Sequence, residues 1–228
     1  MTLSQIAVAG LLGVSATLAQ AVAIPGLVNT GAGLSNGFLD TNYAFVAVLG
    51  DATGTACASV TGKCGAVASN DLIFPLLSNW IPDSNSTLSH WLTPSTNQGQ
   101  SYDQITPGQY TWTLKFNLTG FDPTTASLSG RFATDNNSVA SLNTNGLLNP
   151  STAFSTWSTF SAGASTFVNG INTLTFTVNN LAGGLNPTGL RVEFTASSVT
   201  AVPEPETYAM FLAGLGVVGF VAARRRPS

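Results

Sequence analysis

Charge is scarce in this 228-residue chain, which holds seven basic and ten acidic residues, 7% of the total. Residues 24–201 contain eight acids and four bases, so this part is net acidic and has no basic cluster that would suit nucleic acid. With so few ions, its surface must be wetted by hydroxyl and amide groups. The scarcity of charge argues against a nucleic-acid partner and agrees with an exported protein.

Histidine is almost absent, because His90 is the sole one. With no second histidine and no cysteine near it in sequence, neither a catalytic triad nor a zinc site can be built around it. We expect His90 to pack with Trp91 at the end of a strand, and the alternative is contact with a sugar.

Cysteine is equally rare. Cys57 and Cys64 are the only two, with six residues between them in a glycine-bearing loop. An even pair in an oxidising compartment predicts a disulfide, which would stabilise so short a loop by about 2–3 kcal/mol. The alternative is two free thiols, since a metal site needs more soft ligands.

Catalytic motifs are missing too. The chain has no Gly-x-Ser-x-Gly sequence, no phosphate-binding loop and no Cys–His couple. Glu193 shares a strand face with Arg191, which favours an ion pair over the two spaced carboxyl groups of a glycosidase. We therefore expect no enzyme activity.

The N-terminal segment, Met1–Ala23, is apolar from Ile6 to Ala19 and ends in small-x-small sites at Ala21 and Ala23. That pattern predicts a secretory signal peptide, although its first five residues carry no Lys or Arg. The alternative is an uncleaved N-terminal anchor.

The C-terminal segment, residues 202–228, begins with Pro203 and Pro205, continues with 15 uncharged residues, Ala209–Ala223, and ends in arginines. As a helix the uncharged run would extend about 22 Å, short of the ~30 Å hydrocarbon core of a bilayer. The arginines would stay on the cytoplasmic side. We expect a transient membrane helix that is too short to be a comfortable permanent span.

Three features of this segment occur in a fixed order, namely Pro203-Glu204-Pro205, the apolar run, and the cluster Arg224, Arg225, Arg226. Together they resemble the PEP-CTERM sorting signal. The resemblance implies an exported bacterial protein that is handled by the export machinery and by an exosortase, with cleavage near the Pro-Glu-Pro. It also implies a place in the Gram-negative envelope, at the outer surface or in the extracellular matrix, among exopolysaccharide or biofilm material.

Residues 24–201 form one domain with a β pattern. Tyr110–Leu118 alternates strictly, with aromatic and aliphatic residues on one face and polar residues on the other. Further strands are expected at Tyr43–Val48, Ala126–Phe132, Leu174–Val178 and Leu190–Phe194, with a bulge at Gly130. Short alternating strands separated by Asn, Asp and Gly turns predict an all-β fold, an antiparallel β-sandwich or jelly roll, flanked by an N-terminal signal helix and a C-terminal hydrophobic helix.

A second resemblance covers most of this domain. It is carried by Asn29–Gly31, Asp40–Tyr43, Ser89–Pro94, Tyr110–Trp112, Phe116–Asp122, Gly130–Asn136, Asn169–Leu174 and Asn186–Glu193. These segments are similar to a β-sandwich module common in PEP-CTERM proteins and to galactose-binding-like jelly rolls. The resemblance implies the fold and the setting and brings no activity with it. The chain departs from it at the insertion Thr53–Ser69 and at the turn Leu142–Gly146.

Oxygen-bearing side chains gather at Asp135, Asn136 and Asn137. Such a loop suits Ca²⁺ or a hydroxyl-rich ligand, and Asp40 or Glu193 would have to join it from elsewhere. The alternative is a turn in which the side chains cap their own backbone. We expect the turn, and a structural Ca²⁺ is the minority interpretation.

Four tryptophans offer stacking surfaces for sugars. Trp112 lies on the apolar face of its strand and is expected in the core, whereas Trp80 and Trp91 lie near turns and are the better exposed candidates. We therefore expect a non-catalytic structural or adhesive protein. The alternative is a carbohydrate-binding module for exopolysaccharide that uses Trp80 or Trp91 with Asp135 and Asn136.

Overall fold

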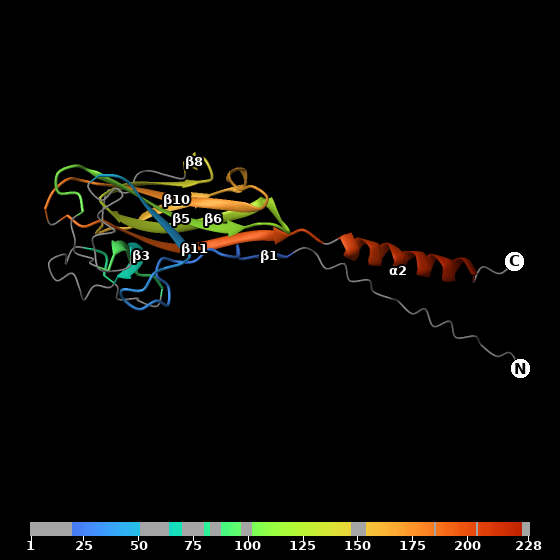
Figure 1. Ribbon diagram of the computed structural model, residues 1–228. Coiled ribbons are helices and arrows are strands. Elements are labelled where there is room, and N and C mark those ends of the chain that lie inside the picture. Colours follow the sequence, from blue (N-terminus) through green and yellow to red (C-terminus); the bar gives the residue numbers. More distant parts are fainter. Residues whose placement is uncertain are drawn as a thin grey trace, which may run out of the picture. The chain divides into compact units, whose positions relative to one another are not determined.

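The structure is a computed structural model in which residues 20–50, 64–69, 80–82, 88–96, 102–146, 154–184, 186–203 and 205–224 are described, with the backbone alone at 64–69 and 205–208 (Figure 1). The chain divides into two units. One is the β-rich unit Ala21–Thr200, and the other contains the helix that follows it.

Eleven strands lie in the described part of the β-rich unit. They are β1 (Ala21–Val22), β2 (Tyr43–Leu49), β3 (Cys64–Ser69), β4 (Trp91–Ser95), β5 (Gly108–Asn117), β6 (Phe121–Asp135), β7 (Asn137–Leu142), β8 (Asn145–Gly146), β9 (Ser158–Ala162), β10 (Ile171–Asn180) and β11 (Gly189–Ala201). A short 3-10 helix, η2 (Ala164–Thr166), follows β9. The helix α2 spans Pro205–Arg224.

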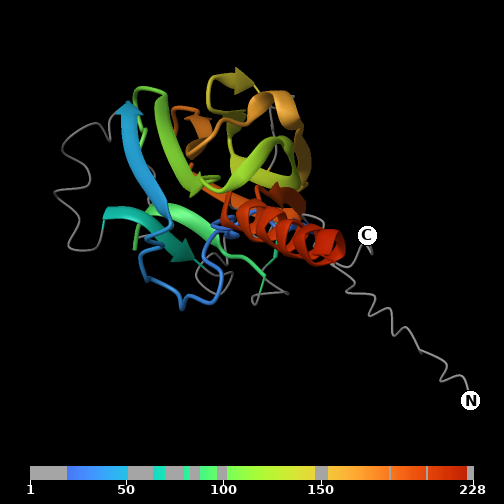
Figure 2. The same cartoon turned by 90° about the vertical axis from the view of Figure 1, so that its right-hand side faces the viewer.

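The strands form two sheets. Sheet A has the order β3-β4-β11-β6-β9, with β1 also paired to β11, and sheet B has the order β2-β5-β10-β7-β8. The pairings with a defined register are all antiparallel. Figure 1 shows the long strands of both sheets running lengthwise, and Figure 2 shows them from the end, with β2 in light blue. The predicted antiparallel β-sandwich is confirmed, whereas the jelly-roll topology and the galactose-binding likeness stay predictions.

The core lies between the two sheets. Strand β5 buries every second residue, and Tyr110, Trp112, Leu114 and Phe116 all lie in the main hydrophobic cluster. Phe176 of sheet B contacts Phe132 and Phe160 of sheet A, with ring centroids 5.5 and 5.8 Å apart. The alternation expected for this strand and the core position of Trp112 are confirmed.

Gly130 does not make the expected bulge where β6 faces β9. The pairing runs without a shift from Leu128 opposite Ala162 to Phe132 opposite Ser158. A Cβ at Gly130 would lie 2.5 Å from Cζ of Phe160 and 2.7 Å from the carbonyl oxygen of Glu193. The glycine is needed because the ring of its cross-strand partner covers its backbone.

The ends of the β-rich unit are tied to β11. Ala21 and Val22 pair with Thr200 and Val199, and the buried Ile24 donates its N–H to Ser197 Oγ at 3.1 Å. Strand β1 therefore falls within the predicted signal peptide, Met1–Ala23. Residues 1–19 lie outside the described part, so the signal helix stays a prediction.

Candidate functional site

The outer face of sheet A, on the side away from sheet B, begins as a ladder of hydroxyl groups. Ser127 and Ser129 on β6 hydrogen-bond to Ser198 and Thr195 on β11, with oxygen–oxygen distances of 3.0 and 3.1 Å. Because side chains alternate along a strand, the next residue on this face of β6 is Arg131. The hydroxyl ladder therefore leads directly into a charged group.

Four residues make up that charged cluster. Arg131 donates from Nε and Nη2 to Glu193 Oε2 at 2.8 and 2.6 Å. Arg191 donates from Nε to Ser89 Oγ at 2.7 Å, and this hydroxyl donates to Glu193 Oε1, also at 2.7 Å. Nη2 of Arg191 lies 3.7 Å from the same Oε1. One buried carboxylate thus serves two guanidinium groups.

The predicted ion pair between Arg191 and Glu193 is present, but it is the weaker of the two. Arg191 is directed mainly to backbone carbonyls, those of Ile81, Pro82 and Ser89, at 3.1–3.2 Å. The sequence interpretation missed Arg131 because that residue comes from a different strand, brought beside Glu193 by the pairing of β6 with β11. The carboxylate of Glu193 is a structural partner of three side chains.

Trp157 covers the charged cluster. The guanidinium carbon of Arg131 lies 4.5 Å from the centre of its ring, and that of Arg191 lies 5.5 Å away. A cation over the face of an indole is attracted to the ring by its quadrupole. The half-buried ring therefore fixes the orientation of the Arg131 guanidinium.

Trp80 and Trp91 are not the exposed platforms that we expected. Trp91 is 2% exposed, and its Nε1 donates to the carbonyl of Ile81 at 3.1 Å. The two indoles lie with ring centres 4.2 Å apart. They pack with Ala133 in a second hydrophobic cluster on the outer face of sheet A, and that packing hides their rings from any sugar.

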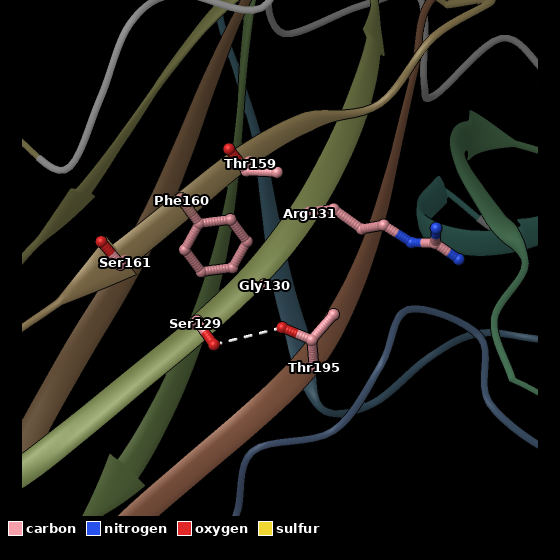
Figure 3. Close-up of a pocket in the computed structure, with 7 residues that line it drawn as sticks. All are labelled: Ser129, Gly130, Arg131, Thr159, Phe160, Ser161 and Thr195. Carbon is pink, nitrogen blue, oxygen red and sulfur yellow. Dashed lines mark hydrogen bonds between the residues drawn. The ribbon is translucent and has the colours of Figure 1, made fainter.

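A shallow depression of about 280 Å³ lies on the same face, beside the charged cluster (Figure 3). Three strands line it, namely the edge strand β9 with β6 and β11. Its residues are Ser129, Gly130, Arg131, Thr159, Phe160, Ser161 and Thr195.

The strand register arranges these residues in two rows. Ser129 is the cross-strand partner of Ser161, and Arg131 is the partner of Thr159. Thr195 extends the first row and Glu193 extends the second. Figure 3 shows Ser129 directed toward Thr195 and Arg131 extending away from both. The depression thus combines four hydroxyl groups with one guanidinium.

Asp135 lies at the end of β6 and is 3% exposed. Burial raises the pKa of its carboxyl to about 7, an effect that the neighbouring Trp80 indole offsets in part. Its Oδ1 accepts from Nδ2 of Asn136 at 2.5 Å. Near pH 7 this buried carboxyl therefore exchanges between neutral and charged forms.

A chain of carboxamides connects Asp135 with a second buried carboxylate. Asn136 Oδ1 accepts from Nδ2 of Asn186 at 3.2 Å, and the same Nδ2 lies 3.2 Å from Oδ1 of Asn180. Asn180 Nδ2 in turn donates to Asp103 Oδ2 at 2.8 Å. A bend at Asn136 joins β6 to β7, and the Asn136 side chain accepts from the backbone N–H of Leu181 at 2.8 Å rather than capping the backbone of its own turn. Ligand contact at Asp135 and Asn136 stays a prediction.

Asp40 braces a different loop. Its Oδ2 accepts from the N–H of Gly31 at 2.7 Å, and its Oδ1 accepts from the N–H and Nδ2 of Asn42 at 2.9 and 3.0 Å. Its negative charge adds to burial in raising the pKa of Tyr43. Three donors therefore satisfy this carboxylate within its own loop.

The metal and cysteine predictions have different outcomes. Within the described ranges, no three His, Cys, Asp or Glu side chains come together as a group that could hold a metal ion. The Cys57–Cys64 disulfide stays a prediction, since Cys57 lies outside the described residues and only the backbone of Cys64 is described. His90 is buried immediately before β4, as expected. Its backbone N–H donates to the backbone carbonyl of Thr30 at 2.7 Å.

The helix α2 begins at Pro205, where a proline is favoured because the first helical N–H needs no partner. This start lies four residues before the predicted apolar run. From residue 209 to 224 every side chain is exposed, including Met210, Leu212, Val217 and Phe220. In the part of the chain that the structure describes, no helix is long and apolar enough to cross a membrane. The prediction of a transmembrane helix is therefore not supported.

Comparison with known families gives a match to the PEP-CTERM protein-sorting motif over residues 201–226. No curated protein matches the chain significantly. The C-terminal segment is a PEP-CTERM sorting motif. The motif indicates an exported protein that an exosortase sorts and attaches at the cell surface.

The sorting motif contains the predicted residues Pro203, Glu204, Pro205, Arg224, Arg225 and Arg226. Glu204, Arg225 and Arg226 lie outside the described residues, while Pro203 precedes α2 and Arg224 ends it. Arg224 lies 5.1 Å from the centre of the Phe220 ring, one helical turn earlier. A cation in the last turn also suits the negative end of the helix dipole.

Proposed function

We propose that the β-rich unit is a non-catalytic structural or adhesive component of the cell surface or extracellular matrix, delivered there by the PEP-CTERM sorting motif. The match over residues 201–226 is the observation that carries the proposal, because it implies a surface destination for whatever precedes it. Export machinery and an exosortase are its partners in transit, and contact with the membrane is transient.

Structural use of the buried acids supports the absence of catalysis. Glu193 is held by Arg131 and Ser89, and Asp40 is held by donors of its own loop. General acid–base chemistry needs a carboxyl that can reach a substrate proton. These two carboxylates are engaged in holding loops and strands together.

The surface chemistry of sheet B supports a structural role in a polar matrix. Threonines occupy the outer face of sheet B in register, with Thr175 opposite Thr113 and Thr177 opposite Thr111. Hydroxyl groups both donate and accept hydrogen bonds, so such a face is wetted without charge. This face would remain soluble among neutral or acidic polysaccharides without binding them through salt bridges.

The alternative function, binding of exopolysaccharide, needs different residues from those first expected. Packing hides Trp80 and Trp91, whereas the depression over β6 and β9 presents hydroxyl groups at the surface. It is this depression that favours the alternative.

A gene deletion in the producing bacterium tests the proposal. We expect cells without the protein to lose surface adhesion or matrix cohesion and to recover it with the full chain. A chain that lacks residues 201–226 should not restore it. Full adhesion and an unchanged matrix in the deletion strain would contradict the structural or adhesive role.

A further inference from the structure

The depression on the outer face of sheet A has the size of a site for one small ligand unit. Its volume is about 280 Å³, just below the roughly 300–1,000 Å³ typical of ligand sites. Its wall on one side is the edge strand β9, so a longer chain could pass across it. A single residue of a polymer fits this shape better than a free-standing large ligand.

Four hydroxyl side chains give the depression its polar lining. Ser129 and Thr195 already hydrogen-bond to each other at 3.1 Å, while Thr159 and Ser161 are exposed on β9. Each hydroxyl group can donate one hydrogen bond and accept two. Groups of this kind match the neighbouring hydroxyl groups of a sugar ring, which donate and accept in the same way.

The side chain beside these hydroxyls is positively charged. Arg131 and Arg191 both contact the carboxylate of Glu193, although residues 24–201 as a whole are net acidic. Arg131 faces solvent, because its side chain is 38% exposed. The guanidinium of Arg131 is therefore the group that can attract an anion approaching from the depression.

The contacts of Arg131 fix the orientation of its guanidinium before any anion binds. Nε and Nη2 face Glu193, and among the described residues no group accepts a hydrogen bond from Nη1. The ring of Trp157, 4.5 Å from the guanidinium carbon, fixes its plane. A planar, preoriented guanidinium suits a carboxylate, and fixing it in advance lowers the entropic cost of binding.

We propose that this depression binds one uronic acid unit of an acidic polysaccharide. Arg131 binds the carboxylate, and the hydroxyl groups of Ser129, Thr159, Ser161 and Thr195 bind the sugar hydroxyls. The inference deepens the adhesive role proposed above and rests on it for its setting, because a surface-sorted protein meets such polymers.

Calorimetric titration of the folded, full-length protein in mild detergent tests this site. The probes are a glucuronic acid oligomer, a glucose oligomer of equal length, and inorganic sulfate. We expect the uronate oligomer to bind at least tenfold more tightly than either of the others, because only it offers both carboxylate and hydroxyl groups. Equal affinity for the glucose oligomer, or for sulfate, would overturn the proposal.

Three variants locate the site. Arg131→Lys keeps the charge but loses the planar fork, and should weaken uronate binding about tenfold, as expected for a hydrogen bond to a charged group. Thr159→Val and Ser161→Ala remove exposed hydroxyl groups from the edge strand and should each weaken it several-fold. The matched control Thr113→Val removes a hydroxyl group from sheet B and should leave the affinity unchanged.

Binding that is unaffected by Thr159→Val, Ser161→Ala and Arg131→Lys, in proteins whose circular dichroism shows a native fold, would place the ligand elsewhere and overturn the proposal. So would the absence of uronate binding at millimolar concentration. Neither result concerns sorting, which is measured separately in cells by processing of the chain.

Discussion

Arg131 donates two hydrogen bonds to one oxygen of Glu193, from Nε at 2.8 Å and from Nη2 at 2.6 Å. This contact joins β6 to β11 on the outer face of sheet A, where the hydroxyl ladder, the charged cluster and the depression all meet. The same ion pair therefore positions Arg131 at the edge of the depression and holds Glu193 beside the buried Arg191.

Glu193→Gln should destabilise the β-rich unit. The substitution removes the carboxylate that Arg131 and the buried Arg191 both contact, and removal of one partner from a buried ion pair costs about 3 kcal/mol or more. The partial exposure of Arg131 places the expected loss at the low end, on the order of 3 kcal/mol. Urea unfolding of the purified protein measures it.

The matched control for Glu193→Gln is Lys115→Gln, which removes one charge from the exposed face of β5. We expect its unfolding midpoint to equal that of the unsubstituted protein. Equal midpoints for both variants would show that the charged cluster contributes nothing to stability.

Asp135 should make the protein less stable as pH rises from about 4 to 7. Its pKa is about 7 in the folded chain, against 3.8 for an unperturbed Asp carboxyl, so in this range the unfolded state binds fewer protons than the folded state. Stability from this group is full below pH ~4, falls as pH rises toward 7, and stays low above it. The difference between the pKa of Asp135 in the folded and in the unfolded chain lowers the free energy of unfolding above pH 7 by on the order of 4 kcal/mol.

Asp135→Asn isolates this effect, because an amide does not titrate and fills nearly the same volume. Unfolding measured from pH 4 to 8 should show that the difference in stability between the variant and the original protein grows in favour of the variant across this range. A constant difference over the whole range would mean that Asp135 titrates at its ordinary pKa.

Gly130→Ala should destabilise the sandwich by about 1–3 kcal/mol, the usual cost of overpacking. The added Cβ would lie 2.5 Å from Cζ of Phe160 and 2.7 Å from a backbone oxygen that cannot easily move. Gly163→Ala is the matched control, since a Cβ there meets no atom within 4 Å. Thermal unfolding of both variants compares them, and similar losses would refute the role assigned to the Phe160 ring.

Alternating apolar and polar residues predicted a strand correctly where one face of the strand is buried and the other is exposed to solvent. Tyr110–Leu118 is the clearest case, because its apolar residues all point into the space between the sheets. The same rule fails for β4 (Trp91–Ser95), in which five consecutive residues are buried. Both faces of that strand are covered, so no alternating pattern exists to reveal it.

The candidate site was predicted less well than the fold. Trp80 and Trp91 stand near turns in sequence, yet they pack against Ala133 and each other. The depression joins residues of β6, β9 and β11, whose proximity depends on sheet order. Arg131 could have been noticed on the polar face of its alternating strand, but its partner Glu193 lies 62 positions away. The C-terminal motif was found directly because all its parts are adjacent in sequence.

Processing of the C-terminal segment in cells tests the central claim most directly. The bacterium would produce either the original chain or one in which Pro203, Glu204 and Pro205 are all replaced by alanine, each with an epitope tag in the exposed turn at Gly120. Mass spectrometry and immunoblotting of cell fractions would then locate the protein and its C-terminus. We predict that the original chain loses α2 and reaches the surface, while the variant keeps α2 and accumulates uncleaved with the membrane fraction. Identical cleavage and surface delivery of both chains would contradict sorting through this motif.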